Sequence, residues 1–175
     1  MIKTERLIPY FRAMKNVDRL TRCPKQREYN LLEHCYMVAQ LFQHFAPLVD
    51  VPYDITVLRL VLNHDILEAV TGDLPYDVKN LSADTSMCWE KIENEATSIH
   101  PILEKYSDSE IKEVMSPGQH HLFKLCDLLE LWIFLKEEHA LGNNTRQCLQ
   151  IIGTCERLIY GHYPVMDRFM DTYKF

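Results

Sequence analysis

Apolar residues recur at intervals of three and four positions along most of this chain, and this spacing constrains the fold more than any other feature. The clearest case is the segment 119–141, whose apolar positions include Leu122, Leu125, Leu129, Trp132 and Leu135. Such spacing places the apolar side chains on one face of an α-helix. The chain has only five glycines and no run that alternates in the manner of a half-buried strand. The sequence therefore predicts an all-α fold.

The expected helices can be bounded from their caps and stops. The sequence Asn30-Leu31-Leu32-Glu33 has the pattern of a capping box, and Gly72 is a suitable stop for a helix that begins near Asp54. The expected helices cover about 4–18, a segment that starts at residue 30, and 54–72, 84–99, 119–141, 145–160 and 164–173. We expect one compact domain over residues 1–175, a bundle of about six to seven helices.

Composition excludes several classes of protein. Hydrophobic residues make up 47% of the 175 residues, which is enough for a real core. The 19 basic and 25 acidic residues give a net charge of −6, which argues against nucleic acid as a partner. No apolar run approaches the roughly 20 residues that cross a bilayer, and the N-terminus lacks a signal-peptide stretch. We expect a cytoplasmic protein without a membrane partner, whose six cysteines are reduced core residues.

Two histidines and two aspartates interrupt apolar helix patterns. His64 and Asp65 follow the apolar run 55–62, His34 falls in the first turn of the helix that starts at residue 30, and Asp127 lies within 119–141. Burying such groups is costly unless their charge is compensated, and a divalent cation is a simple compensation. This set of side chains suits Zn²⁺, Mn²⁺, Co²⁺ or Fe²⁺. Spacing alone leaves hydrogen-bonded core residues as an equal alternative.

The segments around these positions resemble the HD-domain phosphohydrolase superfamily, and most of all its YfbR-type 5′-deoxynucleotidases. The similar segments lie between about residues 10 and 145 and include 30–34, 64–75, 78–79, 124–127 and 141–144. The short chain is also similar to phage dATP triphosphohydrolases of the DatZ type. The resemblance implies an HD-domain bundle, a homo-oligomer in the cytoplasm of a bacterium or phage-infected cell, and one divalent ion (Co²⁺, Mn²⁺, Zn²⁺ or Mg²⁺) held by His34, His64, Asp65 and Asp127.

The resemblance also implies two catalytic carboxylates. Glu68 lies four residues after His64, on the same face of the expected helix, and the matching family glutamate serves the attacking water. Asp73 lies in the sequence Gly72-Asp73-Leu74-Pro75, where it could simply form a turn. By resemblance, Asp73 delivers a proton to the leaving oxygen or positions a water molecule.

A basic segment follows the first expected helix and contains Arg19, Arg22, Lys25 and Arg27. By itself this segment suits either a solubilising loop or a clamp for phosphate, to which arginine presents a forked donor. Arg19 lies fifteen positions before His34, as the phosphate-binding arginine of the family does. The resemblance therefore implies that Arg19 binds the substrate phosphate.

Three further positions bear on the substrate. Lys79 and Lys124 are candidate phosphate contacts by resemblance to the same families. The family commonly has a tryptophan after its arginine, at the wall of the sugar and base pocket, where this chain has Leu20. This difference leaves the selection against ribose and the base preference open.

Together with these residues, the family resemblance implies a metal-dependent enzyme that hydrolyses deoxynucleotides at the α-phosphorus. The first expectation is a 5′-deoxynucleotidase, which releases a deoxynucleoside and phosphate from a monophosphate. A dATP or dNTP triphosphohydrolase would attack the same phosphorus and release triphosphate. A third alternative is a catalytically silent HD-fold module that binds a nucleotide or a protein.

Overall fold

The computed structural model describes residues 7–79 and 81–173, and the regular secondary structure of these residues is helical. The described part has no strand beyond an isolated antiparallel bridge between Asp18 and Asn30. None of the described helices is long and apolar enough to span a bilayer. The elements are α1 (Ile8–Ala13), η2 (Met14–Asn16), α2 (Leu31–Phe45), η3 (Ala46–Val49), α3 (Ile55–Leu62), α4 (Glu68–Thr71), α5 (Tyr76–Lys79), α6 (Ala83–Ile99), η4 (Pro101–Tyr106), α7 (Asp108–Val114), α8 (Pro117–Ala140), α9 (Arg146–Ile159) and α10 (Pro164–Thr172).

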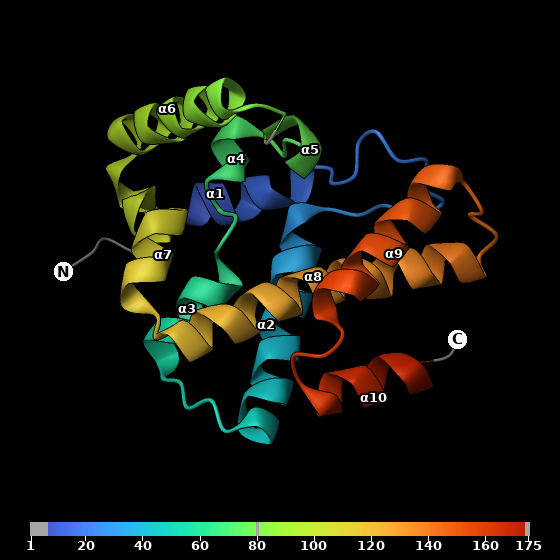
Figure 1. Ribbon diagram of the computed structural model, residues 1–175. Helices are drawn as coiled ribbons and strands as arrows, with labels where there is room; N and C mark the ends of the chain where they lie inside the picture. The colour runs from blue at the N-terminus through green and yellow to red at the C-terminus, as the bar shows by residue number, and fades with distance from the viewer. Residues whose placement is uncertain (1–6, 80, 174–175) are drawn as a thin grey trace.

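The long helix α8 crosses α2 at the centre of the molecule, and α9 lies along α8 on its other side (Figure 1). The apolar stripe predicted for 119–141 faces this centre, because its five members named above are all buried. Helix α6 forms an outer layer and buries only Ala96. The all-α prediction is confirmed, with ten α-helices in the described residues instead of six or seven.

The largest departure from prediction lies in 54–72, where one expected helix is two. Asp54 caps α3 by accepting hydrogen bonds from the backbone N–H groups of Thr56 and Val57. The helix then ends at Leu62, because side chains bind the carbonyls of its last turn. Asn63 Nδ2 donates to Arg59 O at 2.8 Å, and His64 Nδ1 donates to Val61 O at 2.8 Å.

The chain resumes a helix only at Glu68, and α4 ends at Gly72, where φ is +77°. Gly72 is therefore a helix stop, as predicted. His64 and Asp65 belong to the turn between α3 and α4, so the expectation that one helix presents His64, Asp65 and Glu68 is wrong.

Other boundaries follow the prediction more closely. Asn30 caps α2 by accepting a hydrogen bond from the Glu33 backbone N–H at 3.0 Å. The helices expected at 84–99, 119–141, 145–160 and 164–173 are α6, α8, α9 and α10. The expected helix 4–18 is shorter, with α1 and η2 over 8–16 and residues 4–6 outside the described part. Helices α5 and α7 and the 3₁₀ helix η4 were not expected, since none has a long apolar stripe.

Five of the six cysteines are buried free thiols, and the exception is Cys88, which is exposed on α6. The prediction of a reduced core residue is therefore wrong for Cys88. Its helix packs only its inner face on the rest of the molecule, and position 88 falls on the outer face.

The basic connection between η2 and α2 is held in place by the buried carboxylate of Glu138 on α8. Glu138 accepts hydrogen bonds from the backbone N–H groups of Gln26 (2.7 Å) and Arg27 (3.1 Å), from Arg27 Nε (3.3 Å) and from Asn143 Nδ2 (3.2 Å). Arg27 Nη1 also lies 2.5 Å from Glu137, so this arginine holds the loop on α8. The loop that carries Arg19 is thereby fixed to the central helix.

Replacing Glu138 by glutamine is expected to lower the free energy of unfolding by about 2–3 kcal/mol, since several donors lose a charged acceptor. Burial raises the pKa of Glu138, but the hydrogen bonds from Gln26, Asn143 and Arg27 lower it below its usual value. This stabilisation is therefore present above the unfolded-state pKa and is lost as the pH falls through the folded-state pKa. Urea unfolding at neutral and acidic pH measures both effects.

The matched control is Glu137→Gln, which removes a more exposed partner of the same arginine. We expect it to cost about 1 kcal/mol or less. Equal stability of the two variants at neutral pH would contradict the assignment of Glu138 as the anchor of the loop.

Candidate metal centre

The predicted ligands converge from three segments that are distant in the sequence. His34 comes from the first turn of α2, His64 and Asp65 from the turn after α3, and Asp127 from α8. One ligand atom from each of His34, His64 and Asp65 lies within 4.8 Å of the others. Asp127 completes the cluster, since its Oδ1 lies 3.1 Å from His34 Nε2 and 3.9 Å from His64 Nε2.

The two imidazoles have the tautomer and orientation that a metal ion requires. His64 Nδ1 faces the Val61 carbonyl, which can only accept, so this nitrogen carries a proton. His34 Nδ1 donates to the Glu130 carboxylate. The Nε2 atoms of both rings are buried and form no hydrogen bond, yet each faces carboxylate oxygens, with Asp65 Oδ2 at 3.7 Å from His34 and 3.3 Å from His64. Two partnerless Nε2 atoms beside two carboxylates fit a divalent ion such as Zn²⁺.

The charged side chains of the cluster shift one another's pKa values. Burial and Arg19 lower the pKa of His34, but Glu130 and Asp127 raise it to about 9. Burial raises the pKa of Asp65 and of Asp127, but the two imidazoles hold both well below the usual range. A bound cation would take the place of the imidazole protons, so metal binding is coupled to proton release.

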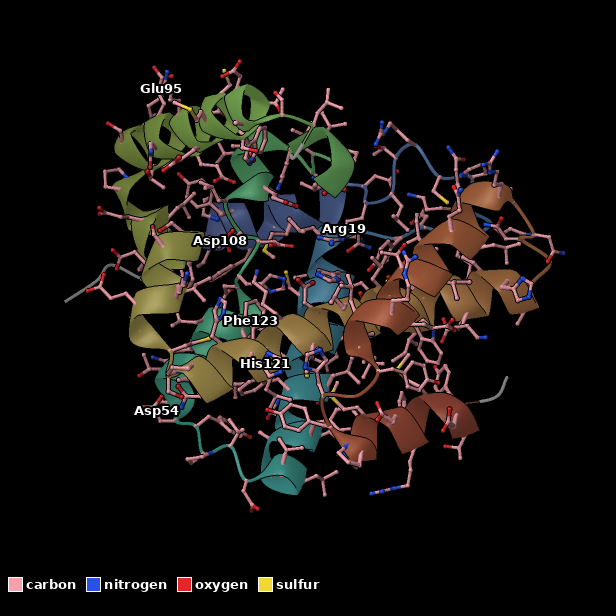
Figure 2. All side chains as sticks on the ribbon, viewed as in Figure 1. Arg19, Asp54, Glu95, Asp108, His121 and Phe123 are labelled. Atoms are coloured by element: carbon pink, nitrogen blue, oxygen red, sulfur yellow. The ribbon has the colours of Figure 1, made fainter. Side chains whose placement is uncertain are left out.

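Arg19 reaches the edge of this cluster from the basic connection, near the start of α2 (Figure 2). Its Nη1 lies 2.8 Å from Asp65 Oδ2 and 3.8 Å from Glu68 Oε2. The guanidinium lies over the ring of Tyr29, with Cζ 5.7 Å from the ring centroid. The structure thus holds a fixed cation next to the predicted ligands.

Lys25 and Arg27, in the same connection, form contacts within the loop and with α8. Lys25 pairs with Asp18 at 2.6 Å and also donates to the Arg19 carbonyl. Arg27 is engaged by Glu137 and by the buried Glu138. Lys25 and Arg27 therefore stabilise the loop itself, whereas Arg19 reaches the cluster.

Glu68 lies beside the cluster at the start of α4. Its Oε1 accepts a hydrogen bond from Lys79 Nζ at 3.1 Å, and its Oε2 is buried without a hydrogen-bond partner. Burial and the neighbouring Asp65 raise the pKa of Glu68 to about 8, although Arg19 and Lys79 oppose the shift. A carboxylate with a pKa near neutral pH is suited to exchange protons.

The remaining predicted residues surround the cluster without touching it. Asp73 is half-buried in the turn beyond Gly72, and its charge contributes to the raised pKa of Glu68. Lys124 Nζ lies 3.6 Å from Asp108, an exposed pair worth less than about 1 kcal/mol. Leu20 adopts a left-handed conformation with φ of +54° and packs partly against the core.

Two buried polar residues behind the cluster, Tyr29 and Glu130, were not predicted from the sequence. The Tyr29 hydroxyl donates to Glu130 and lies 3.1 Å from His34 Nδ1. Glu130 follows Asp127 by three residues and interrupts the same apolar helix, which was a usable signal. Tyr29 gave no such signal, because tyrosine is common in cores.

Comparison with known proteins gives a consistent result. A family model described as 5′-deoxynucleotidase YfbR-like matches residues 6–174. A 5′-deoxynucleotidase of Cronobacter sakazakii is 26% identical over 179 residues, covering 94% of this chain and 87% of the relative. A 5′-deoxynucleotidase of Klebsiella pneumoniae is 25% identical over 182 residues, covering 94% of this chain and 89% of the relative.

Two solved structures share the fold. The cyanophage S-2L HD phosphohydrolase DatZ, solved with dA and one catalytic Zn²⁺ ion, gives a TM-score of 0.64 at 20% identity, covering 100% of this chain and 88% of its own. An HD-domain phosphohydrolase from Listeria innocua gives a TM-score of 0.76 at 20% identity, covering 97% and 86%. The fold described above is therefore that of HD phosphohydrolases.

Proposed function

The chain belongs to the YfbR-like 5′-deoxynucleotidase family, and from this premise we propose that it hydrolyses deoxynucleoside 5′-monophosphates at the α-phosphorus. The products are a deoxynucleoside and inorganic phosphate. The observation that carries the proposal is the pair of buried, partnerless Nε2 atoms that face two carboxylates beside the guanidinium of Arg19. The relatives named 5′-deoxynucleotidase support the same reaction.

Different residues of the site bind the metal ion and the substrate phosphate. His34, His64, Asp65 and Asp127 would hold a divalent ion, which would supply Lewis-acid polarisation of a phosphoryl oxygen and make a water molecule more acidic. Arg19 presents its forked N–H donors to the phosphate and offsets the charge that develops there.

Two carboxylates serve the proton transfers at the attacking water and at the leaving 5′-oxygen. Glu68, with a pKa of about 8 and a buried oxygen that forms no hydrogen bond, accepts a proton from the attacking water. Asp73, in the turn beyond Gly72, serves the leaving 5′-oxygen as proton donor or by positioning a water molecule. Lys79 holds Glu68 in place, and Lys124 adds positive charge near Asp127.

A dATP or dNTP triphosphohydrolase is the second candidate, favoured by the fold shared with DatZ. Both reactions cleave the same bond, and they differ in the phosphates that lie beyond it. Three residues of the basic segment, Arg22, Lys25 and Arg27, could bind β- and γ-phosphates, but Lys25 and Arg27 are engaged in loop contacts. This engagement supports the monophosphate as the preferred substrate.

Product analysis with dAMP and dATP separates the two candidates. The proposal predicts deoxyadenosine and phosphate from dAMP, with much slower turnover of dATP. Release of intact triphosphate from dATP, at a higher kcat/KM than that of dAMP hydrolysis, would establish the second candidate instead. The same assay with AMP measures the selection against ribose at the wall formed by Leu20.

Replacing Lys79 by methionine is expected to shift the acidic limb of the pH–rate profile to higher pH. Lys79 lowers the pKa of Glu68, so its loss raises that pKa and reduces the ionised base at neutral pH. An opposite charge at this distance typically shifts a pKa by about one unit or more. The measurement is log kcat/KM for dAMP against pH. Lys91→Met, on the neighbouring helix α6, is the control, and an unshifted limb in the Lys79 variant would refute the coupling.

We further propose that the enzyme acts in the cytoplasm as a homo-oligomer with a single domain in each copy. Support for the assembly comes from the family resemblance. Light scattering of the purified chain measures its mass directly, and a monomer at all concentrations would contradict the homo-oligomer.

A further inference from the structure

Glu130 is a buried carboxylate on α8, one turn beyond Asp127, whose polar partners come from α2 and its preceding loop. Only 5% of the residue is exposed. Its Oε2 accepts hydrogen bonds from His34 Nδ1 and from the Tyr29 hydroxyl. In the described residues, Glu130 forms no ion pair with an arginine or lysine.

Fold stability alone does not explain a carboxylate at this position. Burying a charge costs several kcal/mol, and an apolar residue of similar volume often serves a core as well or better. Apart from His34 and Tyr29, the position belongs to an apolar stretch of α8, in which Leu129 and Phe134 are both buried. The position therefore keeps a costly group next to a predicted metal ligand.

The hydrogen bond from His34 to Glu130 fixes what the other face of the imidazole can do. With Nδ1 donating to a carboxylate, Nε2 is the ring nitrogen left to bind an ion, and it faces Asp127 Oδ1, 3.1 Å away. An anionic acceptor also makes the ring a stronger electron donor than a neutral acceptor does. His64 is held differently, by the backbone carbonyl of Val61.

Tyr29 connects this arrangement to the phosphate side of the site. Its ring stacks on Phe134, with centroids 3.9 Å apart and planes 14° apart. The Arg19 guanidinium also lies over the Tyr29 ring. The backbone carbonyl of Tyr29 accepts a hydrogen bond from the backbone N–H of Arg19 at 2.8 Å. One rigid tyrosine thus touches Arg19, His34 and Glu130.

We propose that Glu130 is a positioning residue that orients His34 and strengthens it as a metal ligand. In this arrangement, Tyr29 fixes the positions of Glu130, His34 and Arg19 relative to one another. The inference rests on the proposed function for the presence of the ion. The carboxylate acts through His34 and does not touch the substrate. Its removal therefore weakens metal binding first and catalysis as a consequence.

Co²⁺ titration of the full chain without nucleotide tests this inference. Isothermal calorimetry gives the affinity, and the visible absorption of bound Co²⁺ reports its coordination. We compare the wild type with Glu130→Gln, which keeps an acceptor without the charge, and with Glu130→Met, which removes the acceptor. The expected loss of affinity is about 10-fold for glutamine and up to about 100-fold for methionine. Tyr29→Phe is expected to weaken binding by less than the glutamine variant does.

Stability separates a positioning role from a merely structural one. Urea unfolding of metal-free protein is expected to show a smaller loss of stability for Glu130→Gln than for Glu130→Met, because glutamine keeps an acceptor for the Tyr29 hydroxyl and His34 Nδ1 whereas methionine leaves both buried donors unpaired. Weakened Co²⁺ binding by a stably folded Glu130→Gln variant is the mark of a positioning role.

The controls are Glu156→Gln and Tyr160→Phe. In the wild type, Glu156 accepts a hydrogen bond from Trp132 at 3.1 Å, and the Tyr160 hydroxyl donates one to Asp171 at 2.8 Å. Both controls are expected to bind Co²⁺ as the wild type does.

Two results would overturn the inference, and they differ in what else they affect. Wild-type Co²⁺ affinity in both Glu130 variants would refute the role of Glu130 and leave the proposed function intact. No Co²⁺ binding by the wild type would refute the inference together with the metal centre on which the proposed function depends.

Discussion

Replacing Asp65 by alanine is expected to reduce hydrolysis of dAMP by more than about 100-fold and to leave the helical fold intact. Loss of a supporting group behind a metal ligand typically costs 10–100-fold in affinity or activity, and loss of the ligand itself costs more. Asp65 also anchors Arg19 through the 2.8 Å ion pair, so the variant loosens the phosphate-binding side as well. Its side chain is 25% exposed and lies in a turn, so the core is not disturbed.

The Asp65 variant requires both an activity assay and a metal titration. Co²⁺ affinity should fall together with kcat/KM, while the helical circular dichroism signal stays that of the wild type. Asp171→Ala removes an exposed aspartate on α10 and should change neither quantity. Full activity in the Asp65 variant would exclude this residue from the metal centre.

Replacing Arg19 by alanine is expected to separate catalysis from metal binding. Removing one preorganised group that stabilises transition-state charge typically costs about 10²–10³-fold in kcat, and Arg19 is the cation nearest the cluster. Metal affinity should not fall in this variant. Arg19 holds the carboxylate of Asp65, so its loss frees this ligand and removes a positive charge next to the cation site.

We therefore expect Arg19→Ala to lower kcat/KM for dAMP by at least about 100-fold while it binds Co²⁺ as tightly as the wild type or more tightly. Arg19→Lys keeps the charge but not the forked donor, and it should recover only part of the activity. Arg157→Ala, at an exposed position on α9, is the control. Parallel loss of activity and Co²⁺ binding in Arg19→Ala would contradict a phosphate-binding role.

The sequence predicted the fold class and the convergence of residues better than it predicted the local geometry. Apolar stripes located α2 and α8, because long amphipathic helices repeat a signal many times, and the more polar α6 was predicted to end before Pro101. The break at Asn63 was invisible, since it depends on two side chains that bind carbonyls of their own helix. Periodicity continued through 55–72, so the apolar pattern alone could not show that His64 and Asp65 lie in a turn.

In the site as well, the sequence predicted which residues come together but not the contacts between them. His34, His64, Asp65 and Asp127 could be named from the family pattern, and the structure places them together. The pairing of Arg19 with Asp65 and the contact of Lys79 with Glu68 depend on how loops pack, which no spacing rule encodes. Glu130 could have been suspected from its place one turn after Asp127. Its contact with His34 required the crossing of α2 and α8 to be known.

The most direct test of the account is hydrolysis of dAMP in water enriched in ¹⁸O, with Mn²⁺, Co²⁺, Zn²⁺ or Mg²⁺ supplied to metal-stripped protein. The account predicts turnover only when one of these ions is present, with deoxyadenosine unlabelled and ¹⁸O found in the inorganic phosphate. That distribution is the mark of attack at phosphorus with loss of the 5′-oxygen. Absence of turnover with any of the four ions, for dAMP and every other deoxynucleotide, or label in the 5′-hydroxyl of deoxyadenosine, would contradict it.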